Sequence, residues 1–425
     1  MWKGLLAIGS FIASTNTISV PSQQIPATIS RKFAENIPLV PQDGKILLGS
    51  WLDTTPGRDS PASFNERLGF YGSFFQFAQN IPLDFNNPPP VQLIDQTNTN
   101  AIMYLTVYPI TLESVTPKAI SDFVKQIAGF TKNGRAIFIR LAPEMNGSWF
   151  RFGQKPTAFV NMWINVVRAI RANPLCTGRV AFIWAPNIGF GYPFKGGAYS
   201  FNSTTGPDFT LLDTNNNGEY DSKDDPYKAF YPGDEYVDWV GLSTYWFGPN
   251  FPFDKNLLPN STVFSDLLTG VNDDAKINFY DLYSTKRNKP FFIPESGAAF
   301  HQYFLRNPTA SLDPGPGELA IKQAFWRQYI TNPDIIKEFP NLKAICMFEY
   351  TKEEELTMRD FEITKPGTPI LESFKKDLQK VEGNFAFATK NTDSTPKAPP
   401  GQSNGLSSPL GVMAYFLVIL VNILF

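Results

Sequence analysis

The chain has 425 residues, of which 18% are charged and 15% are aromatic, and its formal net charge is −2. Because the chain carries no excess of basic residues, its charge argues against a nucleic-acid partner. With only two cysteines, the chain cannot form a disulfide scaffold or a Cys-rich zinc site. It has a single histidine, His301, which argues against a Ser-His-Asp triad and against a metal site with several histidine ligands.

The N-terminus is typical of a secretory signal peptide. Lys3 precedes a short apolar run, and small residues follow that run. We therefore predict that residues 1–20 are a signal peptide that is removed from the mature protein. The alternative is a first core strand.

Apolar runs alternate with amphipathic segments along the middle of the chain. Eight runs are predicted to be strands: 45–53, 73–78, 101–108, 136–142, 179–185, 237–245, 290–294 and 342–350. Seven segments are predicted to be helices: 63–68, 91–97, 117–130, 156–171, 262–287, 318–330 and 370–379. Thr116 before Pro117, and Pro156, mark two helix starts, because Pro fits the first helical position.

This alternation predicts the fold class. Near-continuous apolar strands indicate a parallel sheet covered on both faces, and eight strand–helix units close a barrel. We predict an α/β fold, a (β/α)8 TIM barrel over residues 40–385, with a long insertion, residues 189–235, between strands five and six. The alternative is a doubly wound open sheet, which no Gly-rich phosphate loop supports. Because Cys346 lies inside a strand, we expect Cys176 and Cys346 to be buried free thiols; a disulfide is the alternative.

Chemistry in such barrels lies at the C-terminal ends of the strands. The residues predicted there are rich in carboxylate, amide and aromatic groups, which fits a sugar site: Trp51, Asp53, Tyr108, Glu144, Trp184, Asn187, Tyr245, Trp246, Glu295, Glu349 and Tyr350. A charged carboxylate at the end of a buried strand costs free energy, so Glu144 is a candidate functional residue. The indole of nearby Trp149 is a good stacking surface for a sugar ring. We count Trp51, Trp184 and Asn187 among the candidates for substrate binding.

Two strand-end glutamates form a candidate catalytic pair. Glu144 follows strand four and Glu295 follows strand seven, so their side chains can converge across the barrel mouth. Retaining glycosidases need two carboxyl groups about 5–5.5 Å apart, one as acid and base and the other as nucleophile. Partial burial and the negative partner both raise the pKa of the acid. The alternative role of each glutamate, taken alone, is a strand-end salt bridge.

Four segments resemble those of glycoside hydrolase family 26, the family of β-mannanases and some mixed-linkage β-glucanases: residues 140–149, 241–245, 294–298, and 346–353 with Asp360 and Phe361. The resemblance covers residues 45–379. It implies that Glu144 is the acid/base and Glu295 the nucleophile. It also implies that Tyr245 hydrogen-bonds the nucleophile and that Trp149 and Trp246 are sugar platforms. Pro143 stands where the mannanases usually carry His, which leaves the mannan specificity open.

The insertion contains a candidate calcium loop. Residues 213–224 follow the spacing of an EF-hand loop, with Gly218 at the turn. The oxygen ligands would come from Asp213, Asn215, Asn217, Glu219, Asp221 and Asp224. This pattern predicts a structural calcium beside the cleft, and no cofactor is expected for catalysis. The alternative is an ordinary turn rich in Asn, Asp and Gly.

Three Asn-x-Ser/Thr sequons occur in the chain. Asn202 and Asn260 lie in loop-like stretches and are predicted to carry glycans in a secreted protein. Asn146 satisfies the same pattern, but a glycan two residues from Glu144 would block the cleft, so we expect Asn146 to be unmodified.

The C-terminus has the order of a glycosylphosphatidylinositol (GPI) attachment signal. Residues 386–403 are predicted to be a stalk rich in Pro, Ser and Thr. Residues 404–425 are predicted to be the propeptide that is removed on attachment, because a polar spacer leads into an apolar tail with no charge after it. Ser403 or Asn404 is the predicted attachment residue.

These features predict a cell-surface or secreted retaining glycoside hydrolase that cleaves β-linked polysaccharide, mannan-like or β-glucan, by double displacement. Within that class the resemblance implies an endo-β-mannanase. Two alternatives stay open: a catalytically inactive carbohydrate-binding wall protein, and a wall-remodelling transglycosylase. We expect a polysaccharide substrate, a membrane contact through the lipid anchor, a monomer, and passage through the secretory pathway to the plasma membrane or cell wall.

Overall fold

The computed structural model describes residue 33 and residues 37–391, which belong to one compact unit. Several predicted features lie outside the described residues: the signal peptide, the GPI propeptide, the attachment residue Ser403 or Asn404, and the stalk from residue 392 onward. Among the helices of the described part, none combines the length and the apolar character needed to cross a membrane.

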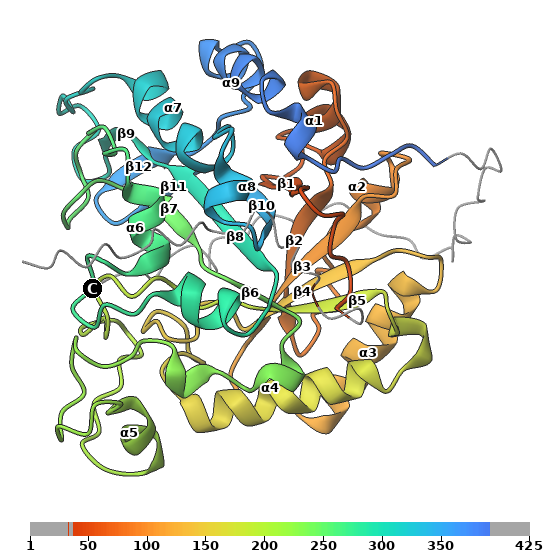
Figure 1. The fold of residues 1–425 in the computed structure, drawn as a ribbon, viewed down its shortest axis with the longest axis vertical. Coiled ribbons are helices and arrows are strands. Elements are labelled where there is room, and N and C mark those ends of the chain that lie inside the picture. Colours follow the sequence, from red (N-terminus) through yellow and green to blue (C-terminus); the bar gives the residue numbers. More distant parts are fainter. Residues whose placement is uncertain (1–32, 34–36, 392–425) are drawn as a thin grey trace, which may run out of the picture. The chain divides into compact units, whose positions relative to one another are not determined.

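Eight parallel strands form a closed barrel (Figure 1). The barrel strands are β1 (Leu47–Leu52), β2 (Phe74–Ile81), β3 (Ile102–Pro109), β4 (Ile137–Leu141), β5 (Val180–Trp184), β6 (Trp239–Gly241), β8 (Phe291–Ala298) and β10 (Leu342–Glu349). Each strand pairs with the next in this order, and β10 pairs with β1, which closes the sheet. The predicted (β/α)8 barrel is confirmed, and the open doubly wound sheet is excluded.

The sixth barrel strand is interrupted rather than continuous. β6 pairs with β8 at Val240 and Phe291, and the short strand β7 (Thr244–Trp246) pairs with β8 again at Thr244 and Ser296. The break leaves Ser243 between the two segments, where its hydroxyl accepts a hydrogen bond from Arg140. The predicted single strand over residues 237–245 is therefore divided where a polar side chain enters the barrel mouth.

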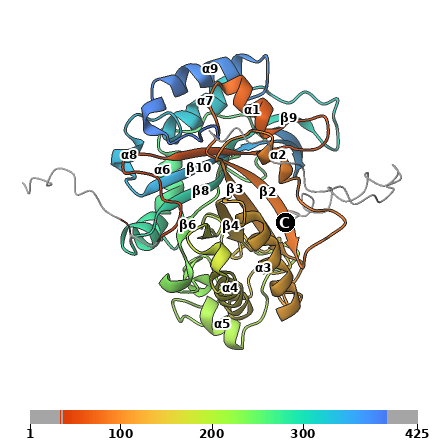
Figure 2. The same ribbon diagram turned by 90° about the vertical axis from the view of Figure 1, so that its right-hand side faces the viewer.

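The major helices cover the outside of the barrel. They are α1 (Pro61–Leu68), α2 (Gln92–Asp95), α3 (Pro117–Thr131), α4 (Pro156–Arg171), α6 (Val263–Thr269), α7 (Glu318–Tyr329), α8 (Ile335–Glu338) and α9 (Pro369–Gln379). Figure 2 shows α1, α7 and α9 on one side of the strands and α3 and α4 on the opposite side. The Thr116 side chain accepts a hydrogen bond from the Ala119 amide, which confirms the predicted cap.

The segment 262–287 is not one helix. α6 ends at Thr269, and Gly270 caps it in the left-handed conformation with φ of 61°. A separate π-helical turn, Tyr280–Thr285, follows after a loop. The insertion after β5 holds only one short α-helix, α5 (Pro207–Leu212), and two 3-10 turns, Lys228–Phe230 and Asp234–Tyr236.

The core has two layers. Inside the barrel, large aromatic rings fill the axis, including those of Phe74, Phe138, Trp239 and Phe292. Gly49 of β1 admits this packing, since a Cβ there would lie 2.3 Å from the carbonyl oxygen of Phe74. The larger layer lies between strands and helices. Cys176 and Cys346 are buried free thiols, as predicted.

A small antiparallel sheet was not predicted from the sequence. It consists of β11 (Thr351–Glu354), β12 (Thr357–Asp360) and β9 (Phe300–Phe304), in that order, and it is built from the segments that follow β8 and β10. His301 of β9 is buried, with its ring nitrogens 2.8 Å from Thr357 Oγ1 and 3.0 Å from the Phe247 carbonyl. Burial lowers the pKa of His301 to about 4, so the imidazole is neutral and structural.

The barrel unit extends further than residue 385. The Ala386 amide donates to the Ile46 carbonyl, the ring of Phe387 stacks on Phe70 at 4.2 Å, and the Asn391 amide donates to Asn98. The stalk predicted to begin at residue 386 therefore starts no earlier than residue 392, because these apolar and backbone contacts hold residues 386–391 on the barrel.

Candidate active site

The chain turns sharply where β4 ends, and this turn presents Glu144. Ala142 and Glu144, on either side of Pro143, both have positive φ, 45° and 54°. Such conformations cost non-glycine residues on the order of 1 kcal/mol and cluster at functional sites. The Glu144 amide donates to the Ala185 carbonyl at 3.0 Å, which ties the turn to β5. The Glu144 side chain is 17% exposed.

Glu295 lies within β8, and a bulge directs it into the barrel mouth. Ile293 pairs with Ile345 and Ser296 pairs with Met347, so β8 has one residue more than β10 over this stretch. Ile293 packs in the layer under the helices. In a regular strand the side chain of Glu295, two residues after Ile293, would also point toward the helices. The extra residue reverses the alternation of side chains, so Glu295 points into the barrel mouth instead. The Tyr245 hydroxyl donates to Glu295 Oε2 at 2.8 Å, as the family resemblance implies.

One arginine connects the two carboxylates. Arg140 of β4 is fully buried, and its Nη1 donates to Glu295 Oε1. Its Nη2 lies 3.8 Å from Glu144 Oε1 and donates to Ser243 Oγ at 2.8 Å. The predicted convergence of the ends of β4 and β8 is thus achieved around a single guanidinium.

The role of Arg140 was not predicted from the sequence. The signal was present, because Arg140 is the one charged residue in the apolar run of residues 136–142. A fully buried charge must find an opposite charge, and two strand-end glutamates were the available partners.

The two carboxyl groups have different electrostatic environments. Burial, and then the charge of Glu295, raise the pKa of Glu144, while Arg140 and Ser243 oppose the rise. Glu295 instead accepts hydrogen bonds from a guanidinium and from a tyrosine hydroxyl, both of which stabilise its negative charge. Glu144 is therefore suited to hold a proton and Glu295 to act as an anion.

Tryptophans lie around the mouth at three positions. The Trp149 indole Nε1 donates to Glu144 Oε2 at 3.1 Å, so its ring is placed against the carboxyl group. Trp51 is half-buried and packs edge-on against Phe348 and Tyr350. Trp246 is half-buried, and its Nε1 donates to the Leu257 carbonyl at 2.8 Å. All three retain exposed surface, as a sugar platform requires.

Trp184 is not a substrate platform. Its side chain is fully buried, its Nε1 donates to the Phe230 carbonyl at 3.0 Å, and its ring packs against Phe279 and Tyr283. Its neighbours Ile183 and Ala185 belong to the layer inside the barrel. Because strand side chains alternate, Trp184 points outward into the helix layer.

Asn187 and Asn146 join the loops that follow β5 and β4. The Asn146 side chain accepts from the Asn187 amide at 2.8 Å and donates to the Asn187 carbonyl at 2.9 Å. Asn187 therefore contributes backbone groups to a loop junction, while its own Oδ1 accepts from Ile188. Asn146 is fully buried, which agrees with its expected lack of a glycan. Asn202 and Asn260 are exposed, and their glycosylation stays a prediction.

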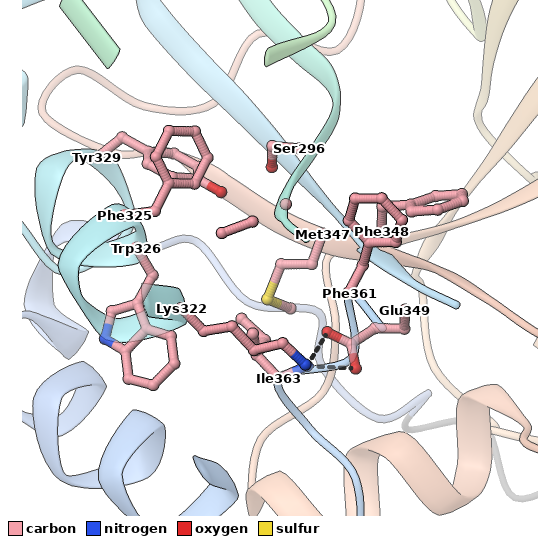
Figure 3. A pocket seen from close by; sticks show the side chains of 12 residues that line it. Ser296, Lys322, Phe325, Trp326, Tyr329, Met347, Phe348, Glu349, Phe361 and Ile363 are labelled. Carbon is pink, nitrogen blue, oxygen red and sulfur yellow. Dashed lines mark hydrogen bonds between the residues drawn. The ribbon is translucent and has the colours of Figure 1, made fainter. Parts of the chain in front are cut away.

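Glu349 does not face the mouth, although it ends β10. Figure 3 shows its carboxylate beside Ile363 in a small pocket that Lys322, Trp326 and Tyr329 also line. It accepts hydrogen bonds from the amides of Ile363 and Thr364 and from the Thr364 hydroxyl. Burial raises the pKa of Glu349 to about 7. Glu349 is thus a structural carboxyl group in the helix layer.

Glu349→Gln is expected to remove one pH-dependent part of the stability. Since the folded-state pKa lies above the usual value of 4.5, the folded wild type binds this proton more tightly, and stability falls as the pH rises from about 4.5 to 7. This shift corresponds to about 3 kcal/mol. Urea unfolding of both proteins between pH 4 and 8, roughly the range that brackets the shift, should show a shallower fall for the variant. Parallel pH profiles would contradict the assignment.

The predicted calcium loop is held by its own hydrogen bonds. Asp213 accepts from the amides of Asn217 and Gly218, and buried Asp224 accepts from the amides of Thr214, Asn215 and Asp221. Within residues 37–391 no group of three or more His, Cys, Asp or Glu side chains is arranged to hold a metal ion.

The calcium site stays a prediction. Calorimetric titration of the chelated protein with calcium tests it, and no heat at millimolar calcium would contradict it.

The fold and the site together define a (β/α)8 barrel with two mouth carboxylates that share one guanidinium. No protein-family model matches the chain, and no curated protein sequence matches it. Similar solved structures include a modular endo-β-1,4-mannanase of glycoside hydrolase family 26 from Cellulomonas fimi, at 16% identity and a TM-score of 0.48, with 84% of this chain and 77% of that one covered.

Two further similar structures are also mannanases. One is a family 26 β-mannanase from Bacteroides ovatus, at 15% identity and a TM-score of 0.46, covering 84% of this chain and 95% of that one. The other is a Bacillus subtilis mannanase, at 15% identity and a TM-score of 0.43, covering 84% and 92%.

Proposed function

We propose that the chain is a retaining glycoside hydrolase that cleaves β-linked polysaccharide, of the endo-β-mannanase type that its sequence motifs resemble. The observation that supports this most is the shared guanidinium: Arg140 brings Glu144 and Glu295 together and leaves them in different electrostatic environments. An intact pair with two distinct environments favours an enzyme over an inactive binding protein, which would need neither.

In the first step Glu295 attacks the anomeric carbon and Glu144 donates its proton to the departing glycosidic oxygen. A covalent glycosyl ester with Glu295 forms as the glycosidic bond breaks. In the second step Glu144, now ionised, takes a proton from water, and the oxygen of that water replaces Glu295 at the same carbon. Two displacements return the original anomeric configuration. Tyr245 and Arg140 orient Glu295 throughout.

The anomeric configuration of the first product tests this proposal. A panel of β-linked mannans and glucans, read by reducing ends, would identify a substrate. Proton NMR during its early hydrolysis is expected to show the β-anomer before mutarotation. An α-anomer as first product would contradict double displacement, and longer products than the starting oligosaccharide would indicate transfer rather than hydrolysis.

Lys352→Met is expected to move the alkaline limb of the pH–rate profile upward by a fraction of a pH unit. Lys352 of β11 is one of the charges that lower the pKa of Glu144, so its removal leaves the acid protonated to higher pH. Its other carboxylate partner, Glu354, keeps Arg359 at 2.9 Å. The pH dependence of kcat/KM measures the shift, and exposed Lys132→Met is the matched control. A downward shift would contradict the sign.

We also propose that the protein reaches the cell surface and is held there by a GPI anchor. The order of charged, apolar and small residues at the two ends supports this location. Treatment of expressing cells with a phosphatidylinositol-specific phospholipase C should release the protein. Retention on the treated cells would contradict the anchor and leave the barrel chemistry unaffected.

A further inference from the structure

A buried glutamine joins the loop that carries Glu144, residues 144–154, to the insertion that follows β5. Gln154 is 1% exposed, and its φ of 53° is unusual for a residue other than glycine. Its Nε2 donates to the carbonyls of Asn146 at 3.2 Å and Pro193 at 2.7 Å, and its Oε1 accepts from the Phe201 amide at 2.7 Å. The donors and the acceptor of one side chain therefore bind both segments.

The same two segments also meet beside Trp149. The Ser148 hydroxyl donates to the Phe194 carbonyl at 2.7 Å, and the Tyr199 amide donates to the Ser148 carbonyl at 2.8 Å. Gly197 permits this close approach, because a Cβ there would lie 2.0 Å from Ser148 Oγ. The Phe194 ring packs edge-on against the Trp149 indole, with the ring centroids 5.0 Å apart. The insertion therefore supplies part of the packing that holds the indole.

The indole in turn holds the carboxyl group of the acid/base. Gly147 lies against the indole, since a Cβ on Gly147 would be 2.3 Å from the Trp149 ring. The Trp149 Nε1 donates to Glu144 Oε2 at 3.1 Å. An indole nitrogen can only donate, so this contact is available before and after the acid gives up its proton. The place of the Glu144 carboxyl group thus depends on the place of the indole, and the place of the indole depends on the insertion.

We propose that Gln154 is a positioning residue for Glu144, which acts through the loop 144–154 and through Trp149. By holding the insertion against this loop, Gln154 keeps Phe194 on the indole and the indole on the carboxyl group. This inference rests on the proposed glycosidase function and deepens it, because a general acid has to lie within hydrogen-bond reach of the leaving oxygen. If Gln154 only stabilised the fold, its loss would affect every substrate equally.

Gln154→Met is expected to impair the substrates that need a proton donor. In the full chain, kcat/KM on the polysaccharide found by the reducing-end panel should fall about tenfold or more, since a shift of about 1 Å can cost roughly 10²-fold. On an aryl oligosaccharide glycoside of the same sugar, kcat/KM should stay within about twofold, because an acidic phenol departs without a proton. Equal losses on both substrates, or no loss on either, would overturn the positioning role.

Gln79→Met is the matched control, because Gln79 of β2 is also buried and its amide pairs with Gln126 of α3. This control should leave the ratio of the two kcat/KM values unchanged. Ser148→Ala serves if Gln154→Met fails to fold, since it removes only the hydroxyl that donates to Phe194. It should lower the polysaccharide-to-aryl ratio about threefold, the value of a weak neutral hydrogen bond. An unchanged ratio for Ser148→Ala would overturn the proposal.

The indole N–H signal of Trp149 gives a readout that needs no substrate. In NMR spectra of protein with isotope-labelled tryptophan, the signal that Trp149→Phe removes belongs to Trp149. It should move as Glu144 titrates, and Glu144→Gln should abolish that movement. Gln154→Met should displace the signal and weaken its movement with pH, whereas a titration identical to that of the wild type would overturn the positioning role. Failure of the glycosidase function itself would appear as a wild type without turnover, and it would leave this measurement in place.

Discussion

Glu295→Gln is expected to lower kcat by on the order of 10⁴-fold or more, the largest effect of any single substitution in the chain. The amide is similar in size and its single oxygen can still accept from Arg140, but it cannot form the covalent glycosyl ester. The fold should persist, so near-ultraviolet circular dichroism should match the wild type. Turnover is measured on the polysaccharide identified by the reducing-end panel.

Glu144→Gln should fail in a different way, and the contrast assigns the roles. With an ordinary polysaccharide the loss should be about 10²- to 10⁴-fold, because protonation of the leaving oxygen is missing. With an aryl glycoside whose leaving group needs no proton, the first step should survive and a burst of phenolate should precede slow turnover. Exposed Glu66→Gln on α1 is the matched control. Wild-type turnover in either active-site variant would show that the role assignment is wrong.

Arg140→Met is expected to destabilise the barrel by about 3–5 kcal/mol at neutral pH, the cost of leaving buried charges uncompensated. The arginine is fully buried and serves Glu295, Glu144 and Ser243 at once. Because Arg140 lowers the pKa of Glu144, its removal should let Glu144 hold its proton to higher pH. The destabilisation should therefore shrink as the pH falls and the carboxyl groups become neutral.

Urea unfolding at acid and neutral pH measures this effect. Arg58→Met is the matched control, since Arg58 is 67% exposed and its pair with Asp53 is 3.7 Å long, so little change is expected. Adding Glu295→Gln to Arg140→Met should recover part of the loss, because the orphaned carboxylate is then removed. A loss for Arg140→Met below about 1 kcal/mol, the range of surface pairs, would contradict a central role for the guanidinium.

The strands and the longer helices were predictable because their signals are local. All eight barrel strands lie within or close to the predicted runs, since buried parallel strands are apolar on both faces. Helix α4 has the predicted limits, 156–171, because Pro156 starts it and its apolar face repeats at helical spacing. The short strands β9, β11 and β12 mix charged and apolar residues, and their pairing depends on segments far apart in the chain. No local pattern identifies them.

The direction of individual side chains was less predictable than the position of the elements. Trp184 and Glu349 were placed correctly at strand ends, but both point into the helix layer. Glu295 points into the mouth only because β8 carries an extra residue opposite β10. A strand alternates with period two, so one inserted residue decides the face, and that insertion is visible only in the pairing with a neighbouring strand.

The amino-acid sequence by itself determined the barrel, through eight apolar runs, and the two candidate glutamates, through their places after the fourth and seventh of these runs. Tertiary structure alone decided that Glu144 and Glu295 meet around Arg140, whereas the hydrogen bond from Tyr245 to Glu295 was already implied by the family resemblance. It also decided that Phe247, just after β7, is held by Arg359 and His301 of the small antiparallel sheet. The physical reason is separation along the chain: Arg140 and Glu295 are 155 residues apart, and only closure of the barrel brings them into contact.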